Sequence, residues 1–226
     1  MHPLRTALLS LSCLIAVPAI GEDLPSFGDS SSGIVSQREE RELGHAYLSI
    51  IRGQTAQIPD PLLKNYLEDT VYRLAESSQV QDPRFSFILL KSPQLNAFAA
   101  PGGIIGVNGG LFLYAQNEGE FASVLAHELA HLSQRHFARG LEARQQMQIP
   151  MMAAMLGGII AMAAGAGDAG VAAIASSQAA AMQEQQRFSR QNEQEADRIG
   201  MQTLGNAGYD PRSMPDMFNR LMSQYR

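Results

Sequence analysis

The segment His127-Glu128-Leu129-Ala130-His131 carries two imidazoles and a carboxylate at a spacing that could bind a metal ion. On an α-helix, His127 and His131 are four positions apart and project side by side from one face. Two neutral imidazoles so placed can bind one zinc ion. Glu128 would then take a proton from a zinc-activated water and pass it to the leaving amine. The motif predicts zinc-dependent peptide hydrolysis, and the alternative is two buried histidines bonded to backbone carbonyls.

A catalytic zinc ion needs a third protein ligand, and an acidic segment later in the chain can supply it. In Asn192-Glu193-Gln194-Glu195-Ala196-Asp197, Glu193 and Asp197 are four apart on one helix face, whereas Glu195 points to another. We expect Glu193 to bind the metal and Asp197 to accept a hydrogen bond from a ligating imidazole. An acidic helix face in contact with solvent is the alternative interpretation.

A further histidine, His136, follows the motif. The extended form of the motif requires a histidine six residues after His131, where this sequence has Phe137, so that class of zinc site is excluded. On a continuous helix, His136 would be rotated by about 140° from His131. We therefore expect His136 to face away from the metal, although it and Tyr209 are candidates on chemistry alone for stabilising an oxyanion.

The elements that must position these residues predict an α+β domain that is mostly helical, with a small β-sheet beside the helix of the motif. Helix-start signals and hydrophobic periodicity predict helices over residues 36–53, from 60–61, over 117–139 and 191–204, and from 210–211. Short apolar runs predict strands over 85–90, 96–99 and 104–107, with a turn at 101–103.

Residues 149–182 are dominated by Ala, Gly and Met, and they contain one charged residue, Asp168. The uncharged run over 149–167 approaches the length of a membrane span, but it contains Pro150 and several glycines. We favour a close-packed helical hairpin or a mobile lid over the cleft, within residues 148–183. Peripheral membrane contact and a membrane span are the alternatives.

The N-terminus predicts a cleaved export signal over residues 1–21, with Arg5 before an apolar run and small residues at Ala19 and Gly21. A flexible lead-in over 22–35 and a single domain over 36–226 would follow. Removal of the signal would also remove Cys13, the only cysteine in the chain, so the mature protein would suit an oxidising compartment. We expect a periplasmic protein, with lipidation of Cys13 as a minor alternative.

The charge of the chain argues against one class of partner. It has 17 basic and 22 acidic side chains, a net charge of −5, and no basic run. A protein that binds nucleic acid needs a basic surface to neutralise phosphates. We therefore expect no nucleic-acid partner.

In combination, these motifs resemble the gluzincin metallopeptidase family of HtpX and the CAAX prenyl proteases, and in particular its periplasmic, BepA-like (YfgC-like) branch. The segments that carry the resemblance are 96–103, 127–131 with Arg135 and His136, 192–200, and 208–211. The resemblance implies one zinc ion per chain, bound by His127, His131 and Glu193. It also implies acid/base catalysis by Glu128 and support of a ligand by Asp197.

The resemblance further implies how a substrate binds. In such endopeptidases an unfolded segment adds as a strand to a sheet edge beside the metal. The residues that resemble this edge are Asn96, Ala97, Phe98 and Ala99, although an ordinary hairpin is the alternative. Edge binding favours sequence-tolerant cleavage.

We therefore expect an endopeptidase that cleaves unfolded, misfolded or stalled envelope proteins in outer-membrane quality control, with the outer-membrane assembly machinery as a further partner. The alternative is a chaperone or assembly factor whose zinc is latent or structural. Members of the BepA-like branch usually continue into tetratricopeptide repeats. The sequence to Arg226 contains none, so no residue here supports an expectation about docking through repeats.

Overall fold

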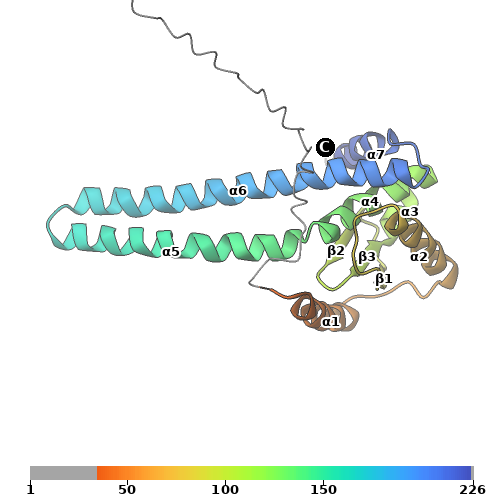
Figure 1. Cartoon of the computed structure of the whole chain (residues 1–226), viewed down its shortest axis with the longest axis horizontal. Helices are drawn as coiled ribbons and strands as arrows, with labels where there is room; N and C mark the ends of the chain where they lie inside the picture. Colours follow the sequence, from red (N-terminus) through yellow and green to blue (C-terminus); the bar gives the residue numbers. More distant parts are fainter. Residues whose placement is uncertain (1–34, 225–226) are drawn as a thin grey trace, which may run out of the picture.

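The computed structural model describes residues 35–224, and Figure 1 shows a small sheet surrounded by helices with a long helical hairpin extending from it. The expected export signal and all but the last residue of the expected lead-in lie outside the described residues. The prediction of a mostly helical α+β fold with a small sheet is confirmed. In chain order the elements are α1 (Gln37–Gln54), α2 (Pro61–Glu76), β1 (Ser86–Leu90), β2 (Ala97–Ala100), β3 (Ile104–Asn108), α3 (Gly109–Tyr114), α4 (Glu118–Ser133), α5 (His136–Ala163), α6 (Gly167–Asn206) and α7 (Ser213–Gln224).

Helices α1 and α2 begin at the residues that the sequence signals indicate. Ser36 accepts a hydrogen bond from the backbone N–H of Glu39, and the Glu39 carboxylate accepts one from the backbone N–H of Ser36, which forms a capping box. Asp60 caps α2 through the N–H groups of Leu62 and Leu63, with Pro61 at the first helical position.

The sheet has the strand order β1-β3-β2, with β3 parallel to β1 and antiparallel to β2. All five residues of β3 are buried, whereas β2 lies at an edge of the sheet. The turn between β2 and β3 contains Gly102 and Gly103 at φ values of 77° and 82°, which side chains disfavour. The segment predicted to resemble a substrate-binding edge is therefore an edge strand.

Helix α4 runs through the centre of the fold and packs against α2, α6, α7 and β2. It begins where the Asn117 side chain accepts a hydrogen bond from the N–H of Glu120. The buried Glu120 carboxylate also accepts a hydrogen bond from Arg220 on α7 at 2.9 Å. The main apolar core surrounds this helix, and its largest members include Leu67, Leu74, Ile105, Leu111, Leu125, Leu129, Leu204, Met214 and Met217. The helix that carries the histidine motif is therefore buried along most of its length.

The prediction of one helix over 117–139 is wrong, because α4 ends at Ser133 and α5 begins at His136. Arg135 separates them in the left-handed conformation, with φ 51° and ψ 41°. This conformation is unfavourable for a residue with a side chain, so contacts elsewhere must hold it. Arg135 donates a hydrogen bond to the carbonyl of Val35 at 2.8 Å and lies 3.5 Å from the Glu40 carboxylate.

Helices α5 and α6 form a long antiparallel hairpin that extends away from the sheet (Figure 1). Gly158 and Gly170 allow the two helices close contact, because a Cβ atom added at Gly170 would lie 2.4 Å from the Gly158 carbonyl oxygen. Residues 149–182 thus lie within a hairpin, and α6 continues without a break through the segment predicted as a separate helix over 191–204.

Candidate active site

Two helices bring three potential metal ligands together. His127 and His131 lie one turn apart on α4, and Glu193 approaches them from α6. The two imidazole Nε2 atoms are 3.0 Å apart. The Glu193 carboxylate lies 3.4 Å from Nε2 of His127 and 3.8 Å from Nε2 of His131. The structure therefore brings together the three residues that the sequence singled out, through nitrogen and oxygen atoms that face one another.

The separations between these donor atoms fit a single zinc ion. Two ligands bound tetrahedrally at about 2.0–2.1 Å from zinc lie about 3.3 Å from each other. The three observed separations, 3.0, 3.4 and 3.8 Å, lie around that value. Burial, with His127 and His136 nearby, lowers the pKa of His131 to about 3, so its imidazole is in the neutral form that binds metals.

Asp197 lies behind His127, one turn after Glu193 on α6. Its Oδ1 atom is 2.9 Å from Nδ1 of His127. The approach is not aligned for a hydrogen bond, so this buried nitrogen has no hydrogen-bond partner among the described residues. Asp197 is nevertheless the carboxylate within reach of the nitrogen of His127 that faces away from Glu193.

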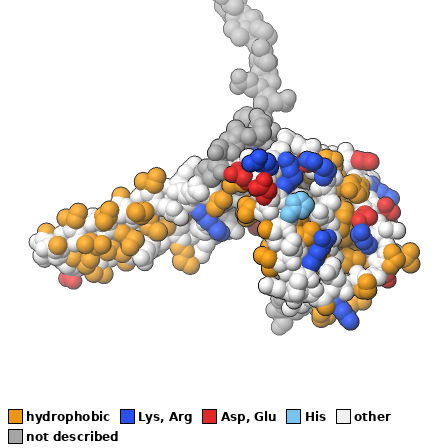
Figure 2. Space-filling view, turned by 90° about the horizontal axis from the view of Figure 1, so that it is seen from below, with side chains coloured by type: hydrophobic (Ala, Val, Ile, Leu, Met, Phe, Trp, Pro, Cys, Tyr) orange, Lys and Arg blue, Asp and Glu red, His pale blue; other side chains and the backbone are white. Residues whose placement is uncertain are grey.

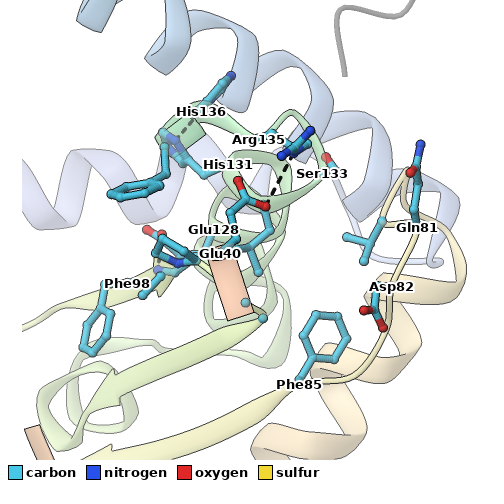
Figure 3. Close-up of a pocket in the computed structure, with 18 of the residues that line it drawn as sticks. Glu40, Gln81, Asp82, Phe85, Phe98, Glu128, His131, Ser133, Arg135 and His136 are labelled. Atoms are coloured by element: carbon cyan, nitrogen blue, oxygen red, sulfur yellow. Dashed lines mark hydrogen bonds and ion pairs between the residues drawn. The ribbon is translucent and has the colours of Figure 1, made fainter. Parts of the chain in front are cut away.

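The expectation that His136 faces away from the site is wrong. Its Nδ1 atom lies 2.9 Å from Nδ1 of His131, and Figure 3 shows the two side chains next to each other. Its Nε2 atom lies 3.1 Å from the Glu195 carboxylate. The rotation of about 140° assumed one continuous helix. The left-handed residue Arg135 breaks the helix and turns the start of α5, and with it His136, toward His131.

Glu195 occupies the helix face expected for it, away from the three ligand atoms. Arg139 donates a hydrogen bond to its carboxylate at 2.8 Å. Burial alone would raise the pKa of Glu195, but the hydrogen bonds from Arg139 and His136 hold it below its usual value. The carboxylate is therefore ionised and accepts hydrogen bonds from both neighbours.

Glu128 lies on α4 beside the ligands and faces the edge strand (Figure 3). Its Oε2 atom accepts a hydrogen bond from the backbone N–H of Ala99 at 2.9 Å. Burial raises the pKa of the Glu128 carboxyl to about 7, and the negative charge of Glu193 adds to this effect, whereas the Ala99 hydrogen bond opposes it. A carboxyl with this pKa can both accept and donate a proton near neutral pH.

A cleft leads to these groups between α4 and the edge of the sheet. Its walls come from the start of α1, the segment 80–85, strand β2 with the following turn, and the end of α4 (Figure 3). The residues that line it include Glu40, Asp82, Phe85, Ala97, Phe98, Ala99, His127, Glu128, His131 and Glu193. The potential ligands, the carboxyl of Glu128 and the edge strand thus share one open space.

Small residues allow α6 to approach the ligand helix closely. Ala196 is fully buried against Ala130 and Ile199. A Cβ atom added at Gly200 would lie 3.0 Å from the Cα and N atoms of His127. Both residues lie within the segment 192–200 that carries the family resemblance, next to Asp197.

Two aromatic side chains lie close to residues of α4. Phe218 of α7 contacts the His127 ring edge-to-face, with the ring centroids 5.7 Å apart, and no sequence signal linked it to the site. Tyr209, a candidate for stabilising an oxyanion, accepts a hydrogen bond from Arg73 and lies 3.4 Å from Glu118 at the first turn of α4. Tyr209 is absent from the lining of the cleft.

Comparison with known proteins shows the family to which the chain is similar. The model of peptidase family M48 matches residues 61–224. Proteins named beta-barrel assembly-enhancing protease are similar to the chain in Escherichia coli (strain K12), with 36% identity over 226 residues, and in Yersinia pestis, with 40% identity over 204 residues. These alignments cover 96% and 90% of this chain but 46% and 42% of the relatives, so the chain spans less than half of their length.

A more distant relative is the mitochondrial metalloendopeptidase OMA1 of Arabidopsis thaliana. It is 28% identical over 150 residues, which cover 65% of this chain and 28% of the relative.

Proposed function

Because the chain belongs to peptidase family M48, whose members depend on a metal ion, we propose that it is a zinc-dependent endopeptidase. The observation that carries the proposal is the meeting of His127, His131 and Glu193 beside the buried carboxyl of Glu128. Three protein ligands that leave one position open are typical of catalytic zinc, whereas structural sites use four. The donor set, two imidazoles and a carboxylate, suits zinc.

The chain's own residues would perform the proton transfers. A zinc ion, when bound, supplies Lewis acidity that activates water and polarises the scissile carbonyl. Glu128 accepts the proton of the attacking water at its carboxylate and donates it to the amine of the leaving chain. The low-dielectric surroundings that raise its pKa to about 7 prepare the carboxyl for both steps.

The edge strand β2 would bind the substrate backbone. Asn96 accepts a hydrogen bond from Asn108, and Phe98 is paired with Gly106 of β3. Alternation along a strand then leaves Ala97 and Ala99 with their backbone groups directed outward. The N–H of Ala99 reaches Glu128 in this direction, so an added substrate strand would lie beside the proton-transferring carboxyl. Backbone pairing tolerates many sequences, which supports unfolded or misfolded chains as substrates.

The location and partners are part of the same proposal. The N-terminal sequence has the form of an export signal, and relatives are named for the assembly of β-barrels. We infer that the protein acts in the periplasm on misfolded or stalled envelope proteins, together with the outer-membrane assembly machinery.

The apolar hairpin is a candidate for peripheral contact with the membrane. Helix α5 is long and apolar enough to cross a membrane. Only 6% of its most apolar 18-residue stretch is buried, and the helix lies far from the N-terminus. It is therefore neither a core helix nor a signal sequence. Large exposed hydrophobic side chains lie at helical spacing on one face of it, as Figure 2 shows for the hairpin as a whole: Ile149, Met152, Met155, Leu156, Ile159 and Ile160.

The facing part of α6 is more polar than α5. It contains Ser176, Ser177 and Gln178, and the tip carries Asp168. One apolar helix and one partly polar helix suit a hairpin that lies at the membrane surface better than one that spans it.

The function can be tested with the purified chain and unfolded casein. We expect cleavage in the presence of zinc and loss of cleavage on addition of a chelator. Glu128→Gln should slow cleavage by at least about 100-fold while the bound metal is retained. Glu184→Gln, at an exposed glutamate of the hairpin, is the matched control and should cleave like the wild type. Unchanged cleavage by Glu128→Gln would exclude the proposed mechanism.

The second candidate is a chaperone or assembly factor with latent zinc, which the exposed Met-rich hairpin favours. It predicts that Glu128→Gln suppresses aggregation of an unfolded protein, and rescues a strain without the gene, as well as the wild type does. Failure of that variant to rescue would remove this candidate.

A further inference from the structure

We propose that His136 is a positioning residue for the ligand His131, which it holds in one tautomer, and that Glu195 holds His136 in turn. The inference rests on the proposed metal site, because it explains how one of the ligands is prepared to bind. His136 and Glu195 neither bind the metal nor transfer the proton in the proposed reaction, and they receive a role here.

His136 contacts the carboxylate of Glu195 through its Nε2 atom. Oε2 of Glu195 accepts a hydrogen bond from the Arg139 guanidinium at 2.8 Å, and a carboxylate paired in this way can only accept. Nε2 of His136, at 3.1 Å, must therefore donate. A neutral imidazole carries one N–H, so Nδ1 of His136 has a lone pair and can only accept.

The two histidines contact each other through their Nδ1 atoms. The Nδ1 atoms of His136 and His131 are 2.9 Å apart, which is a hydrogen-bond distance. Because Nδ1 of His136 can only accept, Nδ1 of His131 must donate. The lone pair of His131 then lies on Nε2, the atom that faces Nε2 of His127 at 3.0 Å and Glu193 at 3.8 Å.

The hydrogen bonds from His131 through His136 to Glu195 form a relay, which is held in place at Glu195 and shielded from water. The side chains of His136 and Glu195 are only 5% and 17% exposed, so solvent competes little for their hydrogen bonds. Arg139, one turn after His136 on α5, holds the Glu195 carboxylate at 2.8 Å. The other tautomer of His131 would direct a hydrogen toward the ligand cluster and leave two acceptors, Nδ1 of each histidine, facing each other.

The Nδ1 atoms of the two ligand histidines have different neighbours, and only that of His131 has a hydrogen-bond partner among the described residues. His127 has a carboxylate, Asp197, 2.9 Å from its Nδ1 atom, whereas His131 reaches its carboxylate through a second imidazole. The left-handed Arg135 makes the second arrangement possible, because it directs the first residue of α5 back toward α4. Partners of this kind fix ligand orientation and increase ligand basicity.

The experiment measures tautomers and metal affinity separately. Histidine side chains of the metal-free wild-type chain, labelled with ¹⁵N, are examined by two-bond ¹H–¹⁵N correlation spectra at a pH at which free imidazole is neutral. We expect a proton on Nδ1 of His131 and on Nε2 of His136. A wild-type spectrum with the proton of His131 on Nε2 would overturn the proposal without any variant.

Variants then test the consequence for metal binding. His136→Leu removes the acceptor while filling the space, and it should weaken zinc affinity about 10- to 100-fold in competition with a chromophoric chelator. His136→Asn restores an acceptor oxygen near the position of Nδ1 and should recover most of that loss. His45→Leu, the same change at an exposed histidine of α1, is the matched control and should bind zinc like the wild type.

Two failures are distinguishable. If the wild-type chain binds no zinc, the proposed metal site is wrong. If it binds zinc but His136→Leu binds equally tightly, with an unchanged tautomer of His131, the metal site stands and the positioning role is overturned. Weakened binding by His136→Leu that His136→Asn does not improve at all would also contradict the hydrogen-bond relay.

Discussion

The carboxylate of Glu128 and the backbone N–H of Ala99 form a hydrogen bond of 2.9 Å that joins the helix of the metal ligands to the edge of the sheet. The edge strand therefore contributes to the charge state of the proposed proton-transfer group, because this bond opposes the rise in its pKa. It also occupies the backbone donor that a substrate strand would use. Binding of substrate at β2 and release of the Glu128 carboxylate are thus linked by one N–H group.

Ala99→Pro tests this link. The N–H of Ala99 points away from β3, at the open edge of the sheet. Its loss should therefore leave the pairing of β2 with β3 intact. We expect kcat/KM for unfolded casein to fall by about tenfold, the cost of one backbone hydrogen bond. Zinc affinity, measured by chelator competition, should not change. Ala99→Gly keeps the N–H and is the matched control. A proline variant with wild-type kcat/KM would argue against substrate binding at this edge.

Glu128→Gln should stabilise the metal-free protein. Burial raises the pKa of Glu128 to about 7, so its ionised form is unfavourable in the folded chain. The folded state then binds a proton more tightly than the unfolded state, and stability falls as the pH rises from the ordinary carboxyl range toward neutrality. Compared with the wild type, we expect the free energy of unfolding of the variant to be higher by about 3 kcal/mol at most at pH 8. At pH 5 the difference should be below about 1 kcal/mol.

The measurement is denaturant unfolding of wild type and variant in the presence of chelator at both pH values. Glu184→Gln, an exposed change of the same type, should have no effect at either pH. Equal stability of wild type and Glu128→Gln at pH 8 would show that the carboxyl titrates at its ordinary value.

Local signals were enough to predict most elements of the fold. The capping pair of Ser36 and Glu39 and the dipeptide Asp60-Pro61 are interactions between near neighbours, so the sequence displays them directly. The same holds for His127 and His131, whose relationship depends on a single helical turn. Glu193 could be found only because the type and spacing of the acidic residues after Gln191 suit a helix face that binds metal.

The break between α4 and α5 could not be predicted, because its cause is distant in the sequence. No glycine or proline marks residues 134–136, so the sequence shows no helix end there. Contacts of Arg135 with Val35 and Glu40, about one hundred positions earlier, hold the left-handed conformation. The position of His136 depends on that break. Helix α5 also continues through Pro150, which sequence rules treat as a helix end.

Replacing apolar residues of the hairpin should reduce membrane contact without unfolding the domain. Ile149, Leu156 and Ile160 are exposed on α5, so their change to Gln removes no core packing. Since burial of each such side chain contributes about 1.5–3 kcal/mol, the triple variant should lose at least about 100-fold in binding to vesicles. The measurement is flotation with vesicles of phosphatidylethanolamine and phosphatidylglycerol.

The matched control for the hairpin replaces three exposed alanines of α6, at positions 172, 179 and 180, by Gln. It should float like the wild type. If the triple α5 variant floats normally but cleaves casein poorly, the apolar face binds the substrate and not the membrane.

Gly200→Ala should weaken metal binding although Gly200 carries no ligand. The new Cβ atom would lie 3.0 Å from the Cα and N atoms of His127, so α6 must move away from α4. Because Glu193 is on α6 and the histidines are on α4, this movement separates the ligands, and we expect zinc affinity to fall by about tenfold or more.

Gly157→Ala is the matched control, since no atom lies within 4 Å of its Cβ position. It should bind zinc normally and gain about 0.5–1 kcal/mol of stability at most from better helix propensity. Equal zinc affinity of the two variants would show that the ligand set tolerates a displaced α6, and the close contact of the helices would then serve packing alone.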